Sequence, residues 1–398
     1  MTTSDVPPSE ERGGFGDFGK QKTFPCDNCG AKLTFSIGAQ KLKCDHCGYE
    51  KQLTFADDAR VDEQDLEGAL STQATRRAAG GQFTGTHEVK CTSCGATVAF
   101  SGSLTSSSCS YCGAPIERDK AHEAPNRLPV DGVCTFRVER DAASTRLKQW
   151  VKSRWFAPGA FKRRGVDGKF DGVYMPFFTF DAMTFTRYSG ERGDAYYVKV
   201  KDGDQEREER RVEWKPARGS FQRFFDDVLI PALQSLPQSL LRSLEPWPLD
   251  ELIPFTDQAL SGKLAHTYEL ELNDSFRLAK KVIERELDGD VRDRIGGDEQ
   301  RVHSMDVGYS ALTYKHVLLP VWILAYLYAG KSYRVVVNAV TGQVSGERPW
   351  SIPKIVAAVL FGAAVAVVVW YVATHHGGRP SPSTTLRQPY GGHVYRTR

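Results

Sequence analysis

The sequence predicts a multidomain protein with two small all-β zinc ribbons, one α+β domain with an antiparallel sheet, and one C-terminal transmembrane helix. Three observations lead to this fold class. Eight of the nine cysteines form four Cys-x-x-Cys pairs before residue 113, the region 125–350 mixes helical and strand patterns, and an uncharged apolar stretch begins at Ile355. A chain of 398 residues is long enough for several such modules.

Composition shifts along the chain set the expected boundaries. The N-terminal stretch is rich in glycine and acids and cannot bury enough surface to fold alone, so we expect it to be disordered. The expected segments are a disordered N-terminus (1–22), zinc ribbon 1 (23–55), a linker or helix (56–82), zinc ribbon 2 (83–120), the α+β domain (125–350), the transmembrane helix (353–374) and a polar tail (375–398).

Eight cysteines are expected to bind two structural Zn²⁺ ions, four cysteines to each ion. The ligand sets are Cys26, Cys29, Cys44 and Cys47 in ribbon 1, and Cys91, Cys94, Cys109 and Cys112 in ribbon 2. A glycine follows every Cys-x-x-Cys and permits the backbone to curl so that its amides point at sulfur. Two facing knuckles give a tetrahedral four-sulfur site with no position left for water or substrate, which makes the ion structural.

Two further side chains, His46 and Cys134, are not expected to bind a metal ion. His46 lies inside a knuckle, but Cys44 and Cys47 complete the ligand set without it. Cys134 is interpreted as a buried thiol. Thioredoxin-like redox chemistry is the rival reading of Cys-x-x-Cys, and it is disfavoured because the motifs are paired and lack a surrounding βαβ pattern.

Hydrophobic periodicity assigns the elements of the α+β domain. Helices are expected at 141–152, 221–244 and 274–287. Strands are expected at 173–188 (broken by Pro176), at 196–200 and 210–214 around a charged hairpin, and in a meander of 316–328, 332–338 and 343–346. The stretches 173–178 and 318–322 are similar aromatic segments with a proline near the start. They indicate either a duplicated half-domain or two prolines at sheet edges.

The stretch Ile355–Ala373 contains no charged residue and is the expected contact with the lipid bilayer. At 1.5 Å per residue its nineteen residues make a helix of about 28 Å, close to the ~30 Å thickness of the hydrocarbon layer. Trp370 and Tyr371 lie near one end, as interfacial aromatic residues do. A buried core helix is the alternative, but the apolar surface runs all round and follows a compact domain.

Flanking charge does not orient this helix, because Arg348 and Lys354 precede it and Arg379 and Arg387 follow it. The cysteines indicate the orientation of the helix instead. No apolar signal segment occurs in residues 1–12, and zinc thiolates suit a reducing compartment. We therefore expect a single-pass membrane protein with its N-terminal body in the cytoplasm.

Several functions are disfavoured by composition and motif. The net charge of only +3 does not fit a dedicated nucleic-acid binder. Gly330-Lys331-Ser332 resembles the end of a phosphate-binding loop, but the required earlier glycine is Ala325 and a strand follows, so no nucleotide is expected. The acidic pairs Asp226-Asp227 and Asp298-Glu299 are interpreted as solvated, and no catalytic residue is proposed.

Short motifs beyond the ribbons carry a family resemblance. They are Leu244-Glu245-Pro246-Trp247, Gly296-Gly297-Asp298, the run from Leu318 through Pro320, Trp322 and Tyr326 to Asn338, Thr341-Gly342, Gly346-Glu347-Arg348-Pro349 and the helix after Lys354. Over nearly the whole chain they resemble a largely uncharacterised family of bacterial membrane proteins with an N-terminal TFIIB-type zinc ribbon. Its members often carry a transferred label naming primosomal protein N′ (replication factor Y), a superfamily II helicase with paired cysteine motifs. The sequence has no helicase nucleotide loop, which argues against that activity.

Three functions remain open. The first is a membrane-anchored interaction or adaptor protein whose ribbons bind an unknown protein partner. The second is a nucleic-acid-binding protein linked to replication or transcription, which the weak net charge disfavours. The third is an enzyme in the α+β domain, which acidic pairs lining a cleft would favour and a filled core would oppose.

Overall fold

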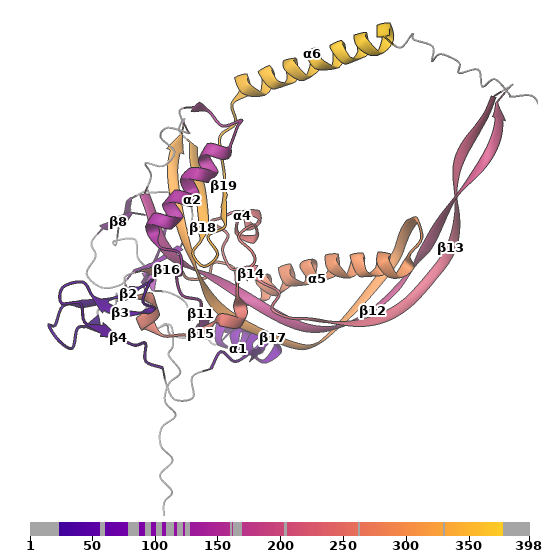
Figure 1. The fold of residues 1–398 in the computed structure, drawn as a ribbon. Helices are drawn as coiled ribbons and strands as arrows, with labels where there is room; N and C mark the ends of the chain where they lie inside the picture. The colour runs from indigo at the N-terminus through magenta and orange to yellow at the C-terminus, as the bar shows by residue number, and fades with distance from the viewer. Residues whose placement is uncertain are drawn as a thin grey trace, which may run out of the picture. The chain divides into compact units, whose positions relative to one another are not determined.

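A computed structural model describes most of the chain between residues 24 and 376 (Figure 1). The described ranges are 24–55, 60–78, 87–91, 97–100, 106–108, 115–117, 122–123, 128–159, 161, 169–202, 205–261, 263–328 and 331–376. The expected disordered N-terminus lies outside them, and so does the expected polar tail apart from residues 375 and 376, which are helical. The chain divides into two compact units, one of residues 1–154 and 159–349, the other of 155–158 and 350–398.

Ribbon 1 is a four-stranded antiparallel sheet. Its strands, in spatial order, are β1 (Phe24–Pro25), β2 (Lys32–Ser36), β3 (Lys41–Cys44) and β4 (Glu50–Lys51). Apolar and polar residues alternate along β2, so Leu33 and Phe35 point to one face and are buried with Leu42. This core is very small, and two of its five fully buried members are cysteines.

The strands around the second set of cysteines repeat two of the three strand pairs of ribbon 1. They are β6 (His87–Lys90), β7 (Thr97–Phe100), β8 (Ser106–Ser108), β9 (Pro115–Glu117) and β10 (His122–Glu123). The pair Phe24↔Leu33 recurs as Val89↔Val98, 65 residues later. The pair of residues 43 and 50 recurs as 108 and 115, at the same offset. The eight cysteines are related by this offset too, so the repeat extends from sequence to register.

A ten-stranded sheet forms the body and is largely antiparallel. The main strand order is β13 (Gln205–Phe225), β12 (Lys169–Asp202), β17 (Glu299–Tyr328), β11 (Gly132–Val133) and β15 (Ile253–Pro254). Shorter strands complete it: β5 (Gln64–Asp65), β14 (Ile230–Pro231), β16 (Leu264–Ala265), β18 (Lys331–Asn338) and β19 (Val344–Gly346). Strand β5 leads into helix α1 (Leu66–Ala78), whose first residue is buried in the body. The segment 56–82, expected to be a linker or a helix, therefore contains a helix, and its Leu66 contributes to the core.

Helices cover both faces of this sheet. They are α2 (Arg140–Ser153), α4 (Gln238–Arg242), α5 (Leu272–Ile295) and the short 3-10 turns η3 (Leu249–Glu251) and η4 (Asp257–Leu260). On one face, Val173, Met175 and Phe177 pack with Leu240 and Leu241 of α4. On the other face, β12 packs against α1 and α5. The expected helices at 141–152 and 274–287 are confirmed, and α5 is longer than expected.

The expected helix over 221–244 is wrong. Residues 221–225 end strand β13, and only α4 is helical in this range. Pro231 and Pro237 supply no backbone N–H, which prevents one continuous helix here. Phe224 and Phe225 instead point to opposite faces of β13, and only Phe225 is buried.

The strands at 173–188 and 196–200 are one continuous strand, β12, which Pro176 does not break. The carbonyl of Pro176 accepts a hydrogen bond from the N–H of Ala232 at 3.0 Å. Because the N and O of one strand residue point to the same side, the missing N–H faces Ala232 and not β17. The ladder between β12 and β17 is therefore intact. The expected charged hairpin is confirmed, and the meander is confirmed with a first strand that begins at Glu299.

The body is built from two similar halves, which supports the duplication. Each half runs strand–helix–strand–strand: β11, α2, β12 and β13 in the first, and β16, α5, β17 and β18 in the second. Each first strand pairs in parallel with the other half, β11 with β17 and β16 with β12. The Pro320 carbonyl accepts from Ala339 at 3.0 Å, as that of Pro176 does from Ala232.

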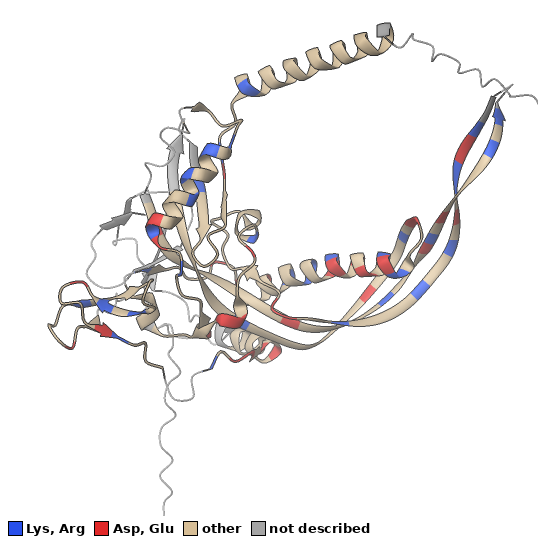
Figure 2. Cartoon of the chain, viewed as in Figure 1, with Lys and Arg blue, Asp and Glu red and all other residues tan. Residues whose placement is uncertain are grey.

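Strands β12 and β13 continue beyond the start of β17 as a two-stranded distal ribbon, residues 194–202 and 205–213 (Figure 1). The Gly296-Gly297-Asp298 motif lies at its root, where both glycines adopt positive φ. The Asp298 N–H donates to the Gly193 carbonyl at 2.9 Å, and its carboxylate accepts from Ala195 N–H at 2.8 Å. Acidic and basic residues are interspersed along the distal ribbon (Figure 2).

The second unit consists of helix α6 (Ile352–His376) and the segment 155–158. The helix covers the expected 353–374 and is long and apolar enough to cross a membrane over Ile352–Thr374. None of its most apolar window is buried inside the structure. By contrast, Val317, Leu318 and Leu319 of β17 are fully buried in the sheet core.

Candidate metal centre

Two knuckles of the same backbone geometry bring four cysteines of ribbon 1 together. In the first, Gly30 N–H donates to the Cys26 carbonyl at 2.8 Å; in the second, Gly48 N–H donates to that of Cys44 at 2.9 Å. The two glycines have φ of 73° and 76°, a region that disfavours a Cβ atom. No atom lies within 4 Å of a Cβ added at either position, so conformation and not space requires glycine.

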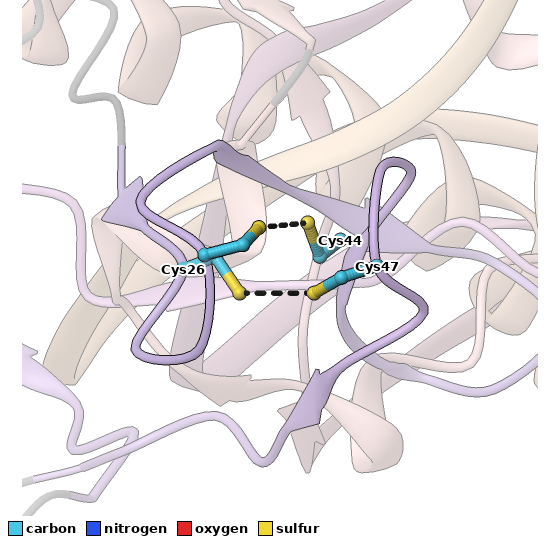
Figure 3. A group of neighbouring side chains, drawn as sticks. Cys26, Cys44 and Cys47 are labelled. Carbon is cyan, nitrogen blue, oxygen red and sulfur yellow. Dashed lines mark hydrogen bonds between the residues drawn. The ribbon is translucent and has the colours of Figure 1, made fainter.

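The sulfur atoms are spaced as a tetrahedral zinc site requires (Figure 3). The Sγ atoms of Cys26 and Cys47 are 3.6 Å apart, and those of Cys29 and Cys44 are 3.5 Å apart. All four lie within 4.8 Å of one another. A regular tetrahedron with Zn–S bonds of about 2.3 Å separates its sulfur atoms by about 3.8 Å. The residues present therefore fit a four-coordinate zinc ion, and the distances are far too long for disulfide bonds.

The electrostatics of the four thiols favour a bound cation. The backbone N–H of Tyr49 and then the Asn28 side chain lower the pKa of Cys47 to about 6. At Cys29 the Ala31 N–H favours the thiolate, but the other three thiols and burial raise the pKa to about 12. One thiolate forms readily, and further thiolates are opposed by the charge already present. A dication at the centre removes this opposition.

Ribbon 1 is attached to the body by hydrogen bonds on the side away from its knuckles. Ser261 bonds twice to β2: its hydroxyl donates to the Leu33 carbonyl at 2.9 Å, and its carbonyl accepts from Phe35 N–H at 3.3 Å. The Gln40 amide donates to the Phe136 carbonyl at 2.8 Å and accepts from the Thr135 hydroxyl at 2.7 Å. No sequence pattern marks these contacts, because Ser261 and β2 are more than 220 residues apart.

The second predicted set is only partly within the described residues. Cys91 is buried, with 3% of its surface exposed, while Cys94, Cys109 and Cys112 lie outside the described residues. His46 is exposed and is not part of the ribbon 1 cluster. Cys134 is 1% exposed, which confirms the buried thiol.

A second group of acidic residues lies where β12, β13 and β17 meet. Oxygen atoms of Glu63, Asp181 and Asp226 lie within 4.8 Å of one another. The Lys315 ammonium is 2.8 Å from Asp227 and 3.7 Å from Glu63. Burial, followed by the negative charge of Asp227 and Asp181, raises the pKa of Asp226. Sequence reasoning missed this group, although Lys315 between apolar strand residues is a signal for it.

Described residues of the body line two cavities of similar size. One of about 460 Å³ is lined by Phe35 of ribbon 1 and by Lys263, whose ammonium is 4.8 Å from the Trp322 ring centre. Burial and the nearby Arg140 lower the pKa of Lys263. The other, of about 420 Å³, is lined by residues that include Asp226, Asp227, Arg242, Glu245 and Trp247. The acidic pair expected to be solvated therefore lines a cavity.

This chain is similar in sequence to an uncharacterised protein of Bacillus subtilis (strain 168), YdjG. The two sequences are 24% identical over 253 residues, and the match covers 62% of this chain and 70% of that protein. No family model matches the sequence. No solved structure matches the fold.

Proposed function

We propose that this chain is a membrane-anchored zinc-ribbon protein that acts as an interaction module, with two structural zinc ions. The observation that carries the proposal is the exposure of both knuckles of ribbon 1. Residues 27–30 and 45–48 are exposed, while the opposite side of the ribbon is bonded to the body. The ribbon thus presents a fixed surface, and its four sulfur ligands leave the ion no catalytic position.

The second zinc ion is supported by the repeated register of β6–β9. Two strand pairs of ribbon 1 recur there at an offset of 65 residues, the offset that also relates the eight cysteines in the sequence. The membrane anchor is supported by α6, whose apolar surface is exposed on all sides. In this proposal the body lies in the cytoplasm, where thiolates stay reduced. The resemblance to TFIIB-type ribbon proteins agrees with an interaction role.

The test is affinity capture with the full-length, detergent-solubilised chain, with and without nuclease. A surface variant, Asp45→Arg with His46→Ala, changes the exposed knuckle without touching a zinc ligand. A matched control, Lys199→Glu with Lys201→Glu, changes charge on the distal ribbon. We expect a defined protein to bind the wild type and the control, and to be lost with the surface variant while zinc content is unchanged.

Two outcomes would redirect the proposal. Binding that disappears after nuclease treatment would favour the nucleic-acid function, which should then weaken steeply with added salt. Partners that bind the surface variant as well as the wild type would exclude the knuckles as the binding surface.

A second candidate function, binding or conversion of a small molecule, is favoured by the cavity beside Asp226. Its volume of about 420 Å³ is in the range of ligand sites, and it contains acidic, basic and aromatic side chains. A screen of small metabolites for thermal stabilisation, with Asp226→Asn as the comparison, tests this candidate. A ligand that stabilises the wild type but not Asp226→Asn would support it.

A further inference from the structure

A cavity of about 460 Å³ is lined jointly by ribbon 1 and the body. Phe35 and Ile37 of ribbon 1 line it together with Phe170 of β12 and Trp322 of β17. Ribbon 1 is held in place beside the cavity, because the Phe35 N–H donates to the Ser261 carbonyl at 3.3 Å. The volume lies in the range of small-molecule sites, so the space is large enough for a ligand.

Lys263 places a half-buried ammonium group at this cavity. Its Nζ lies 5.1 Å from the ring centre of Phe136 and 4.8 Å from that of Trp322. Among the described residues, no carboxylate lies within 4.0 Å of this Nζ and no acceptor forms a hydrogen bond with it. Burial, and then the positive charge of Arg140, lower the pKa of Lys263, while Asp171 acts in the opposite direction. An anion in the cavity would therefore favour the charged form of this amine.

The aromatic rings at the cavity are fixed by contacts of their own. Phe170 stacks on Trp322, with ring centres 5.4 Å apart and planes inclined by 20°. Phe136 meets the Trp322 ring edge-on at 5.2 Å. The indole N–H of Trp322 donates to the Val138 carbonyl at 2.8 Å, so the ring has only apolar and π contacts to offer a ligand. Rings held in this way favour a flat apolar group, which can stack on them or meet them edge-on.

The charged side chains at the cavity limit the charge of a ligand. Lys263 and Arg140 bring two positive charges, and Glu139 and Asp171 bring two negative charges. Glu139 and Arg140 are exposed, so salt and water screen them more than they screen the half-buried Lys263. One negative charge beside Lys263 is matched by its ammonium, whereas a phosphate dianion would also be repelled by two carboxylates. The cavity therefore suits a carboxylate better than a phosphate ester.

We propose that this cavity binds a small aromatic carboxylate, whose anionic group pairs with the Lys263 ammonium and whose ring contacts Phe170 and Trp322. The site is separate from the exposed knuckles of ribbon 1 and from the cavity beside Asp226. Hydrogen bonds between an ammonium and a carboxylate are charge-assisted, and such a bond contributes on the order of 10- to 100-fold in affinity.

A ligand in this cavity contacts ribbon 1 and the body at the same time. Phe35 belongs to β2, the strand that Ser261 also holds through the Leu33 carbonyl. Binding therefore strengthens the attachment of ribbon 1 and fixes the orientation in which it presents its knuckles. By mass action, a ligand at ten times its Kd lowers the population of detached ribbon by about tenfold.

The test measures ligand binding to the full-length, zinc-loaded chain in detergent by isothermal titration calorimetry. The probes are benzoate, phenylacetate and indole-3-acetate, each compared with its uncharged primary amide. We expect at least one acid to bind at least about tenfold more tightly than its amide. Lys263→Met keeps an apolar side chain of similar length without the charge. It should lose at least about tenfold in affinity for that acid, with zinc content unchanged.

The matched control is Lys280→Met. The Lys280 ammonium also lies over two rings, 4.8 Å from the ring centre of Phe276 and 5.0 Å from that of Tyr309. Lys280 lines none of the cavities found among the described residues, so its replacement should leave the affinity unchanged. A second variant, Ile37→Trp, leaves Lys263 in place but fills the cavity from ribbon 1, and it should also lose the binding.

Hydrogen exchange locates the bound acid. At ten times its Kd, the acid should slow exchange at the amides of β2 by about tenfold. The inference would be overturned if none of the three acids binds more tightly than its amide, or if Lys263→Met binds the acid as the wild type does. An equal loss in Lys280→Met would also overturn it, because the loss would then follow net charge and not this site. Binding that leaves exchange in β2 unchanged would place the acid away from ribbon 1 and contradict the site.

Discussion

Ribbon 1 and helix α6 are stabilised in opposite ways, although both are small parts attached to the same body. Ribbon 1 has a core of a few side chains and four convergent sulfur atoms, so an ion held by these sulfur atoms would supply most of its stability. Helix α6 buries none of its apolar window in the protein, so its stability must come from its surroundings. The difference shows that neither part can be judged by its internal packing.

Their attachments differ as well. Ribbon 1 bonds to the body mainly through backbone atoms of β2 and the Gln40 amide. The first turn of α6 is held by one ammonium group and one backbone N–H against residues 155–158. Amino-acid substitutions can distinguish stabilisation by an ion, expected for ribbon 1, from stabilisation by the surroundings, expected for α6. They follow from the largest expected effect to the smallest.

Loss of one zinc ligand should have the largest effect. A Cys44→Ser change removes a buried sulfur ligand, and structural zinc sites contribute on the order of 10–16 kcal/mol of apparent binding energy. We expect one zinc ion fewer per chain by elemental analysis and rapid proteolysis within 24–55. The neighbouring His46→Ala should keep all its zinc. Full zinc occupancy in Cys44→Ser would exclude the four-sulfur site.

A charged residue at the centre of α6 should weaken the insertion of this helix into a membrane. Ala363→Arg places a guanidinium in the middle of the apolar span, at a cost of about 2.5–3.5 kcal/mol for insertion. We expect a larger fraction of the protein to be extracted by alkaline carbonate, with zinc content unchanged. Ala363→Leu is the matched control and should remain in the membrane fraction. An unaltered extraction of Ala363→Arg would argue against a membrane span.

The knuckle glycines offer a finer comparison with a helix glycine. Gly30→Ala forces a side chain into positive φ at a cost of about 1–3 kcal/mol. We expect zinc affinity, measured by chelator competition, to fall roughly 5- to 100-fold. Gly362→Ala in α6 should leave it unchanged. Equal affinity in Gly30→Ala and wild type would show that the left-handed turn is not required.

Ser261→Ala tests the attachment of ribbon 1 and not its zinc site. The change removes the hydrogen bond to the Leu33 carbonyl and should cost about 1 kcal/mol. Hydrogen exchange at the amides of β2 should become several times faster, with zinc still bound. Zinc loss in this variant would mean that the body, and not the ion alone, holds the ribbon together.

The smallest effect is expected at Cys134, where burial raises the pKa of the thiol to about 11 from an ordinary 9.0. The folded state favours the neutral thiol, so its contribution to stability is complete below pH 9 and is lost as the pH rises towards 11. In the native zinc-loaded chain, alkylation of Cys134 at pH 8 should be far slower than in denaturant with a chelator, by mass spectrometry. Fast native alkylation would contradict its burial.

Features that depend on neighbouring residues could be read from the sequence. The knuckles, α5 and α6 follow from local spacing, so Cys26–Cys47, 274–287 and 353–374 were predictable. The predicted helix over 221–244 was wrong because strand-like alternation and helical spacing are hard to distinguish in a short apolar run with two prolines. Here the hydrogen bonds available from β12 decided the outcome.

Features that depend on distant residues could not be read in the same way. The contact of Ser261 with ribbon 1, the hold of residues 155–158 on α6 and the position of Asp226 beside Asp181 all join separate parts of the chain. Pro176 illustrates the physical reason. Whether a proline interrupts a sheet depends on which neighbour its nitrogen faces, and that neighbour, Ala232, is set by the fold.

The crossed pairing of the two halves has a consequence for synthesis of the chain. Strand β11 has its parallel neighbour in β17, about 185 residues later, and β16 has its own in the earlier β12. The first half therefore emerges from the ribosome without one of its neighbours, and no cut between the halves leaves two complete sheets. Folding must wait until Leu318 has been made, and such distant pairing is slow. By then α6 follows within a few dozen residues, so completion of the sheet and emergence of this long apolar helix come close together in time.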